Sequence, residues 1–587
     1  MCGIAGLMTA SGAAPDQGSL DRLADALAHR GPDGRGQHVA GGVGLVQTRL
    51  AIIDLEGGRQ PILDGTGRAI VANGEVYNYI ELKAEMPEVR FVTGSDCEPP
   101  LYLSRDEGTS FPLRLRGMYA LAIHDSHHRR LTLSRDPFGI KPLYVAETTA
   151  GLAFASEPQA LVAAGVVAPE VNPAARAELL QLQFTTGAET IFTGIRRLLP
   201  GETVVAEQGR IIESHRLAAL PAAPPVDGPL AGDAEALLYQ LDGVLMDSVE
   251  LHQRSDVPYG MFLSGGIDSS VVLAMMARLN PKGVLAFTAG FPGTGVHDER
   301  AHARQLAESV GACHVEVEFT EADFWSLLPR VAAAMDDPAA DYAVLPTFKL
   351  AAEARRQVKV ILSGEGGDEL FGGYGRYRHA MRPWPLTKPM RRSGTFDGLG
   401  VLRDETKGWR AGIAAAERAE ALPGRSRLQV VQAVDCADWL PNDLLGKLDR
   451  CLMANGVEGR VPFLDPVVAA FAFRLPDALK VRHGMGKWLL RKWLDKAMPA
   501  ARPFDRKRGF TVPVAEWIAK RPEIGQLVAR QPGIAEIARP GTVEKLFRHS
   551  GKDTGFACWT LLFYALWHQR HILGIPAEGD VGAALSR

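Results

Sequence analysis

Short apolar segments, separated by Gly, Asp and Pro, dominate the first 215 residues. Between them, residues 20–30 have the apolar spacing of a helix. The strand-like segments are 44–55, 68–79, 118–125, 130–136, 142–147 and 151–157. Closely spaced short strands with turn residues between them are typical of antiparallel sheets. We therefore predict an antiparallel, sheet-rich domain over residues 1–215.

The pattern changes after residues 216–236, a stretch rich in Pro, Ala and Gly that we interpret as a linker. Strand-like segments at 257–263, 284–291, 313–319 and 358–364 then alternate with helix-like segments at 268–279, 299–311 and 347–357. This alternation predicts a parallel sheet with crossover helices. Trp and Leu recur at helical spacing from about 375 to 575. We therefore predict a second domain over 237–587, an α/β sheet followed by a helical part.

Composition narrows the class of protein. The chain has 587 residues, 46% hydrophobic and 23% charged, as in an ordinary soluble protein. The net charge of -3 offers no electrostatic case for nucleic acid or a membrane surface. The six cysteines lack paired spacing, which suits a reducing compartment. With no leader and no long apolar run, we expect a cytoplasmic protein without membrane or nucleic-acid partners.

The opening "MCGIAG" places a small residue, Cys2, directly after the start Met. Removal of Met1, which is efficient before a small residue, would leave a thiol and a free α-amine on Cys2. That amine has an ordinary pKa of about 7.7–8, and an N-terminal amine can act as base for its own side-chain nucleophile. The alternative is that Cys2 is a small apolar residue that starts a strand. These six residues alone leave both open.

"FLSGGIDSS" (262–270) is a Gly-rich turn between a predicted strand and a predicted helix. Gly265 and Gly266 allow close approach of a ligand, and the helix N-terminus suits phosphate. Ser264 and Ser269 add hydroxyl donors, and Asp268 could hold Mg²⁺. The Lys of a G-x-x-x-x-G-K-[ST] loop is missing, so this is a different kind of site. A purely structural turn is the alternative.

"VILSGEGGDELFGGY" (360–374) is a second junction of the same kind. Since open parallel sheets bind ligands at the carboxyl ends of their strands, both junctions should face one crevice. Asp268 and Asp368 would then form a carboxylate pair for Mg²⁺, which prefers oxygen ligands and substrate phosphates. Lys487 starts a helix-like run and could stabilise a developing anion. By itself it would be interpreted as a surface lysine.

The first domain carries residues that suit a free α-amino acid. Arg49 could clamp a carboxylate, while Glu75 and Asp96 could bind an ammonium group. Asn73 and the Gly74 N–H could form an oxyanion hole. Taken singly, each is an ordinary turn or strand-edge residue. The histidines of "HDSHHRR" (124–130) lie between two strands, and we interpret this segment as an exposed hairpin turn rather than a metal site.

The motifs together resemble the glutamine-hydrolysing asparagine synthetases, which are class II glutamine amidotransferases. The matching segments, in the order of that family, are "CGIAG", "HRGPDG", "RLAIIDL", "NGEVYN", "TGSDCE", "SGGIDSS", "LSGEGGDELFGGY" and "VEGRVPFLD". The resemblance implies an N-terminal-nucleophile αββα sandwich joined to an ATP-pyrophosphatase-type parallel sheet with a helical C-terminal part. It also implies ATP and Mg²⁺ as cofactors and a homodimer.

For the first domain, the resemblance implies that Cys2 attacks the glutamine amide and forms a thioester. Asn73 and Gly74 would hold the oxyanion, and ammonia would pass through an internal tunnel to the second site. The residues implied to bind glutamine, through side chains or the 49–53 main chain, are Arg49, Leu50, Ala51, Ile52, Ile53, Asn73, Gly74, Glu75 and Asp96.

For the second domain, the resemblance implies that ATP adenylates a carboxylate and releases pyrophosphate. Asp268 and Asp368 would hold Mg²⁺, Glu365 would act at the acyl-adenylate and ammonia step, and Lys487 would stabilise the transition state. The residues implied to bind the nucleotide are Leu263, Ser264, Gly265, Gly266, Asp268, Ser269, Ala289, Ser363 and Gly364.

Two features depart from the family pattern. Pro99 and Pro100 interrupt the expected start of a helix, so we predict that the helix after Asp96 begins late. Residues 336–350, which the resemblance places at the acceptor, are similar to a broad bacterial branch. Three hypotheses follow: amidation of aspartate, amidation of another carboxylate on a glycan, lipid or peptide, and a non-catalytic homologue. The presence of Cys2, Asp268, Glu365 and Asp368 disfavours the third.

Overall fold

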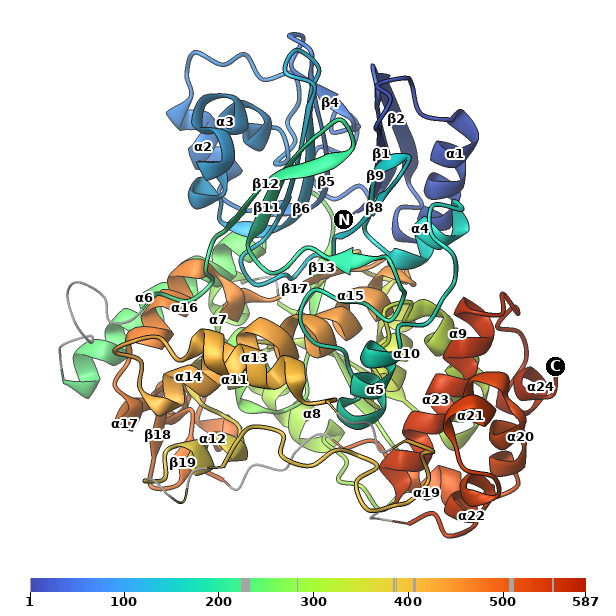
Figure 1. The fold of residues 1–587 in the computed structure, drawn as a ribbon. Helices are drawn as coiled ribbons and strands as arrows, with labels where there is room; N and C mark the ends of the chain where they lie inside the picture. The colour runs from blue at the N-terminus through green and yellow to red at the C-terminus, as the bar shows by residue number, and fades with distance from the viewer. Residues whose placement is uncertain are drawn as a thin grey trace.

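The computed structural model describes residues 2–222, 233–281, 283–383, 386, 388–404, 408–505, 511–551 and 554–587. Most of the predicted linker, 223–232, lies outside them. Figure 1 shows two upright sheets at the N-terminal end of the molecule, above a larger body of helices around a third sheet.

Two six-stranded sheets, in which every strand pair is antiparallel, build the N-terminal part. The first has the order β10 (Arg196–Arg197), β8 (Tyr144–Thr148), β9 (Gly151–Ala155), β1 (Cys2–Thr9), β3 (Val43–Arg49), β2 (Gly34–Ala40). The second has the order β12 (Arg210–Arg216), β11 (Glu202–Glu207), β7 (Arg130–Arg135), β6 (Gly117–Asp125), β5 (Arg68–Val76), β4 (Ile62–Leu63).

The two sheets stack face to face with helices outside them. Ile4, Leu45, Val71, Leu133 and Phe154 meet in the layer between the sheets. Helices α1 (Gln17–Ala26) and α4 (Pro158–Ala163) cover the first sheet, and α2 (Tyr79–Glu85) and α3 (Pro99–Glu107) lie outside the second (Figure 1). The predicted αββα sandwich is therefore confirmed.

The helix content of this part differs from the sequence prediction, because the apolar pattern marked only one helix. The helix after Asp96 also starts earlier than expected from its two prolines. Pro99 and Pro100 are the first residues of α3, with Glu98 as the N-cap, so the helix is not delayed beyond them. The first turn of a helix does not use its own N–H groups, so proline is tolerated there.

A five-stranded parallel sheet forms the centre of the C-terminal part. Its order is β15 (Cys313–Glu318), β14 (Leu285–Gly290), β13 (Tyr259–Phe262), β16 (Val360–Leu362), β17 (Glu458–Arg460). The chain runs outward from β13 to β15, then returns to the other side of β13 with β16. The strand order therefore reverses between β13 and β16, and ligands of open α/β sheets bind at such a switch point.

Helices surround this sheet and fill the rest of the chain, as predicted. Those before and between the strands are α5 (Pro173–Leu182), α6 (Ala234–His252), α7 (Ile267–Leu279), α8 (Arg300–Ser309), α9 (Glu321–Ala334), α10 (Val344–Ala354), α11 (Gly367–Phe371), α12 (Gly375–Ala380), α13 (Ala411–Glu420), α14 (Arg427–Val434) and α15 (Gly446–Met453), with a π-helical segment η3 (Asp435–Leu445). The later helices are α16 (Pro466–Arg474), α17 (Asp477–Lys480), α18 (Trp488–Ala497), α19 (Val514–Ala519), α20 (Ile524–Arg530), α21 (Pro532–Ile537), α22 (Thr542–Arg548), α23 (Gly555–His571) and α24 (Val581–Leu585).

Short elements complete the chain: the 3₁₀ turns η1 (Ala28–Arg30), η2 (Gly108–Arg114), η4 (Pro462–Leu464) and η5 (Pro499–Ala501), and a hairpin of β18 (Val481–Arg482) and β19 (Met485–Gly486). Among the described residues, every helix is too short or too polar to cross a membrane.

Candidate active sites

Cys2 begins β1 and pairs with Arg49 at the end of β3, so it lies where two interior strands of the first sheet meet the end of that sheet. It is 6% exposed. Its backbone N–H donates to Asn73 Oδ1 at 3.1 Å, and Gln47 Nε2 donates to its Sγ at 2.9 Å. Asn73 lies on β5 of the facing sheet. The thiol is therefore held between the two sheets of the sandwich.

Two buried polar atoms beside Cys2 have no hydrogen-bond partner among the described residues. They are Asn73 Nδ2 and Glu75 Oε2. Between them, Gly74 has a φ of 147°, and a Cβ there would lie 2.0 Å from Met118 O, so only glycine fits. An unpaired buried polar group costs about 1–3 kcal/mol. A site with an unused donor and an unused carboxylate oxygen is typical of one that takes a polar ligand.

Arg49 and Asp96 stand at the edge of the same site. The Arg49 guanidinium donates to Leu55 O at 2.9 Å and Asp54 O at 2.6 Å, so it holds the 50–55 loop. Asp96 accepts from the Val76 N–H at 2.8 Å. The structure thus brings together the residues that were predicted for the first site. In this arrangement the Arg49 guanidinium is bound to carbonyl groups of the 50–55 loop.

The electrostatics of this site follow from burial. Burial raises the pKa of the Cys2 thiol, opposed in part by the Leu50 N–H and Arg49. Burial, then Asp96 and Glu458, holds the pKa of Glu75 well above its usual range, against the pull of Arg460. Because the Cys2 thiol is not intrinsically acidic, it needs a base to become a nucleophile.

Two residues of this site, Glu458 and Arg460, come from β17 of the other sheet and were not predicted. Arg460 Nη2 lies 3.5 Å from Glu75 Oε1, and Arg460 Nε donates to Glu458 Oε1 at 2.5 Å. The Arg460 carbonyl accepts from Ser363 N at 2.8 Å, in the loop after β16. The motif "VEGRVPFLD" contains both residues, but its letters alone do not indicate which distant residues they contact.

The second site lies where β13 and β16 end. Ser264 Oγ and Ser269 Oγ lie 3.1 Å apart after β13, and α7 starts next to Gly266 with no side-chain cap. A Cβ at Gly364 would lie 2.9 Å from Asp268 Cβ, so glycine there lets the two loops touch. Leu263 bonds through its N–H to Phe287 O of β14, the strand that also carries Ala289.

Lys487 joins the two predicted carboxylates. Its ammonium donates to Asp268 and lies 2.7 Å from Asp368 Oδ1. The Lys487 N–H donates to Phe371 O at 3.0 Å, and the residue caps α18 with a φ of 59°. It is 2% exposed, not the surface lysine that the isolated pattern would indicate. Burial lowers the pKa of Lys487, but the two carboxylates outweigh it and raise the pKa overall.

The donor set here suits a magnesium ion that shares its coordination with phosphates. Asp268 and Asp368 offer carboxylate oxygens from the first turns of α7 and α11. Mg²⁺ is commonly held by one or two carboxylates together with substrate phosphates and water. Within the described ranges no group of three or more His, Cys, Asp or Glu side chains has the arrangement of a metal site, so an all-protein cage does not fit.

The charge of Glu365 is influenced by this carboxylate pair and by a further charged group. Burial raises its pKa, and the charges that act on it are Lys447, Asp341, Asp268 and Asp368. Lys447 Nζ donates to Asp341 Oδ2 at 2.8 Å. Within residues 336–350, Asp341 therefore acts electrostatically on Glu365.

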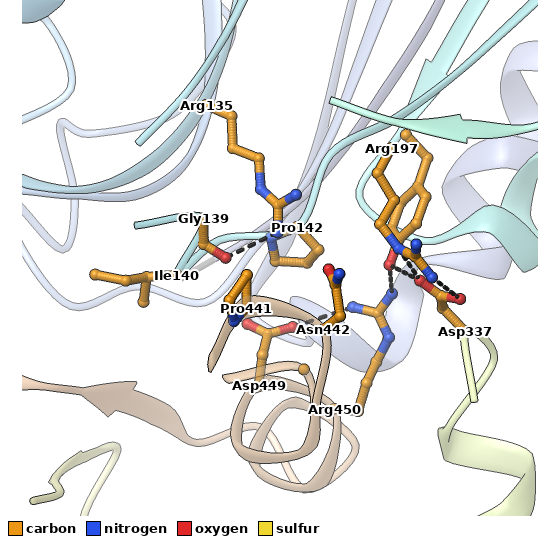
Figure 2. Close-up of a pocket in the computed structure, with 12 residues that line it drawn as sticks. Arg135, Gly139, Ile140, Pro142, Arg197, Asp337, Pro441, Asn442, Asp449 and Arg450 are labelled. Carbon is orange, nitrogen blue, oxygen red and sulfur yellow. Dashed lines mark hydrogen bonds and ion pairs between the residues drawn. The ribbon is translucent and has the colours of Figure 1, made fainter. Parts of the chain in front are cut away.

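A buried ion pair connects the first site to the C-terminal part of the chain. Arg30 Nε donates to the Cys2 carbonyl at 3.3 Å, and its Nη1 donates to Asp449 Oδ2 of α15 at 2.8 Å. Figure 2 shows Asp449 and Arg450 lining a cavity of about 20 Å³ at this interface. That volume is enough for about one water-sized molecule.

Comparisons with known proteins agree with this two-part architecture. The glutamine amidotransferase domain model matches residues 1–217, and the asparagine synthase model matches residues 240–569. A protein of Mycobacterium tuberculosis is 34% identical over 97% of this chain and 97% of its own length. Asparagine synthetase 1 (glutamine-hydrolyzing) of Bacillus subtilis is 30% identical, again over 97% of both chains. An amidase of Gibberella zeae is 28% identical over 83% of this chain and 82% of its own.

An amidotransferase sandwich thus precedes a parallel-sheet domain that matches the asparagine synthase model over most of its length. The chain belongs to the glutamine-hydrolysing asparagine synthetase family.

Proposed function

We propose that this chain is a glutamine-dependent asparagine synthetase. In the first site glutamine yields glutamate and ammonia. In the second, ATP and aspartate yield β-aspartyl-AMP and pyrophosphate, and ammonia then displaces AMP to give asparagine. The observation that carries the proposal is the direct connection between the two sites: Arg460 contacts Glu75 of one and bonds to Ser363 of the other.

At the first site, Cys2 Sγ attacks the side-chain carbonyl of glutamine after removal of Met1. The α-amine of Cys2 takes the thiol proton, which a raised thiol pKa makes necessary. Asn73 Nδ2 and the Gly74 N–H stabilise the oxyanion, and the C–N bond then breaks to release ammonia and leave a thioester. Water hydrolyses the thioester to glutamate.

The same site binds the amino-acid end of glutamine. Glu75 and Asp96 accept from the ammonium group, which supplies the partner that Glu75 Oε2 lacks. Arg49 binds the carboxylate in exchange for its carbonyl contacts with the 50–55 loop. The main chain of residues 49–53 lines the pocket.

At the second site, the α7 N-terminus with Ser264, Gly265, Gly266 and Ser269 binds the phosphates that leave as pyrophosphate. Leu263, Ala289, Ser363 and Gly364 lie at the strand ends where the nucleotide would bind. Asp268 and Asp368 would hold Mg²⁺, which supplies charge neutralisation on the phosphates. Lys487 stabilises the negative charge that develops on the phosphorus centre, and Glu365 acts where ammonia meets the acyl-adenylate.

Chemistry explains why two sites share one chain. A carboxylate is a poor acyl donor until adenylation provides AMP as leaving group. Ammonia is mostly protonated at pH 7 in water, so it must be released and consumed inside the protein. We propose that it crosses the interface through the cavity lined by Asp449 and Arg450, which holds one molecule of this size.

A second acceptor class remains the alternative. The relative from Gibberella zeae carries the name amidase, so similarity at this level does not restrict the acceptor to aspartate. On that alternative, the same adenylation chemistry amidates a carboxylate of a glycan, lipid or peptide.

Pyrophosphate release tests the proposal. With ATP, Mg²⁺ and glutamine, aspartate should stimulate release of pyrophosphate together with formation of asparagine. Cys2→Ala should abolish the reaction with glutamine and retain it with ammonium chloride. Glutamine hydrolysis without aspartate-dependent pyrophosphate would contradict asparagine synthesis and favour the alternative acceptor.

A further inference from the structure

A chain of buried charged side chains runs from the first site into the C-terminal part. The Cys2 carbonyl accepts from Arg30 Nε at 3.3 Å, and Arg30 donates through Nη1 and Nη2 to Asp449 at 2.8 and 3.2 Å. Arg450, the next residue of α15, donates through Nη1 to Asp449 Oδ2 at 3.2 Å and through Nε to Asp336 Oδ1 at 2.6 Å. Arg30, Asp449, Arg450 and Asp336 are each at most 3% exposed. We call these four residues the Arg30–Asp336 chain.

Arg450 uses its whole guanidinium in this arrangement. Its Nη2 donates to the Tyr144 hydroxyl of β8 at 3.2 Å, so each of its three nitrogen atoms has a hydrogen-bond partner. Figure 2 shows its contact with Asp449 beside the cavity. A planar guanidinium bound through every nitrogen has one orientation. Arg450 therefore fixes the direction in which the Asp449 carboxylate faces Arg30.

The far end of the Arg30–Asp336 chain is anchored as well. Asp336 Oδ2 accepts from the Gln159 N–H at 3.1 Å, and the Asp336 carbonyl accepts from Trp567 Nε1 at 3.1 Å. Asp337, the next residue of the same turn, receives Nε and Nη2 of Arg197, both at 2.7 Å. Gln159 and Arg197 belong to the sandwich, and Trp567 belongs to α23. The chain thus ends on a turn that side chains and main chain of both parts hold in place.

Arg30 also has an anion from its own part of the protein. Its Nη1 donates to Glu157 Oε1 at 2.8 Å, so Glu157 is the alternative support for Arg30. Asp449, however, takes both Nη atoms, and a bidentate pair constrains geometry more than a single bond. Lys141 Nζ lies 3.8 Å from Asp449 Oδ1 and competes for that carboxylate. Without Arg450, the Asp449 carboxylate is free to turn toward Lys141 and away from one nitrogen of Arg30.

We propose that Arg450 is a positioning residue for Cys2. Anchored on Asp336, it orients Asp449, which holds Arg30 and, through it, the main chain of the nucleophile. The C-terminal part thereby supports glutamine hydrolysis in the sandwich. This inference rests on the proposed hydrolysis of glutamine at Cys2 and adds a residue from the other half of the chain to that site.

The first measurement is glutamate formation from glutamine by the full-length protein. A small displacement of a reacting group is costly, since about 1 Å can lower a rate about 100-fold. Arg450→Met should lower kcat about 10-fold, and KM for glutamine should stay within about twofold because Arg450 does not contact the proposed glutamine-binding residues. Arg450→Lys keeps the charge but not the three-way contact, so it should lower kcat only about threefold.

The second measurement asks whether Arg450 acts through Asp449. Members of one hydrogen-bonded network give non-additive losses. Asp449→Asn combined with Arg450→Met should therefore lower kcat about as much as either change alone, about 10-fold rather than about 100-fold.

Arg116→Met is the matched control. Arg116 also joins the two parts, since its Nη2 lies 3.0 Å from Asp465 Oδ2, but its printed contacts do not lead to Cys2. Glutamine hydrolysis in this variant should stay within about twofold of the wild-type rate. Denaturant unfolding of all variants, and pyrophosphate release with ammonium chloride as nitrogen source, show whether each protein is folded.

Each contrary result is distinct. An unchanged kcat in Arg450→Met would mean that Glu157 suffices to hold Arg30 and would overturn the inference. A raised KM with unchanged kcat, a loss shared equally by ammonia-dependent pyrophosphate release, an equal loss in Arg116→Met, or additive losses in the double variant would overturn it too. Absence of glutamine hydrolysis in the wild-type protein would instead contradict the proposed function.

Discussion

Replacement of Asp449 by Asn should impair glutamine hydrolysis at the first site and leave the ammonia-dependent reaction at the second site nearly unchanged. Asp449 is 3% exposed and receives both Nη1 (2.8 Å) and Nη2 (3.2 Å) of Arg30, which is fully buried. Lys141 Nζ lies 3.8 Å from the same carboxylate, and Arg450 Nη1 lies 3.2 Å from it. The variant therefore leaves three buried cations with one anion fewer.

The magnitude follows from these contacts. Breaking a buried ion pair by removal of one partner costs about 3–5 kcal/mol. The Asn oxygen keeps one neutral acceptor, which restores about 1 kcal/mol. We expect a loss of about 2–4 kcal/mol in the free energy of unfolding from that difference. Asp25→Asn, at an exposed pair with Arg35, is the control and should cost less than about 1 kcal/mol.

Activity assays test the expected effect of Asp449→Asn on each site. Because Arg30 Nε also holds the Cys2 carbonyl, a loosened Arg30 displaces the nucleophile. Glutamine hydrolysis should fall about 10-fold, the effect of about 1.4 kcal/mol, while ammonia-dependent pyrophosphate release stays within twofold. Denaturant unfolding measures the stability loss. A loss no larger than that of Asp25→Asn, or an equal fall of both activities, would refute the reasoning.

Three further predictions concern single residues. Lys487→Met should lower pyrophosphate release at least about 100-fold, because the cation between two carboxylates is lost, while glutamine hydrolysis at Cys2 is unchanged; a parallel loss of both would contradict it. Gly74→Ala should abolish glutamine hydrolysis and lower the unfolding midpoint, since its Cβ would clash with Met118 O at 2.0 Å; hydrolysis at the wild-type rate would be inconsistent with this. Burial and Asp368 raise the pKa of Glu369 to about 8 in the folded state. Between about pH 4.5, where the unfolded Glu369 loses its proton, and pH 8, the folded state still holds that proton. The free energy of unfolding should therefore fall as the pH rises from about 4.5 to 8. In Glu369→Gln that fall should shrink, as unfolding midpoints at pH 5, 6.5 and 8 would show; an identical pH profile would count against the assignment.

The fold was largely predictable because its elements carry strong local patterns. Short apolar segments between turn residues marked the strands of both domains, and the change to alternating strands and helices marked the parallel sheet. Short or atypical elements were not predicted from the sequence. β17 is only Glu458–Arg460, too short for a periodic signal. Helix α3 opens with two prolines, which led us to expect a later start for the helix.

The candidate sites were predictable to the extent that they lie at strand ends. Asp268 and Asp368 each follow a strand within a few residues, so their convergence could be inferred from parallel topology alone. Arg460 follows no such rule. Its place in the first site became apparent only from its neighbour, Glu75.

The amino-acid sequence by itself determined the two-domain class and the Gly-rich loops, because each depends on local patterns, and it made Cys2 the candidate nucleophile through the order of family motifs along the chain. Only the tertiary structure decided which strand borders which, that Lys487 is buried between two carboxylates, and that β17 joins Ser363 to Glu75. Contacts between residues hundreds of positions apart arise from how whole sheets and helices bury their apolar faces. Local sequence patterns specify those faces but not the partner against which each one packs.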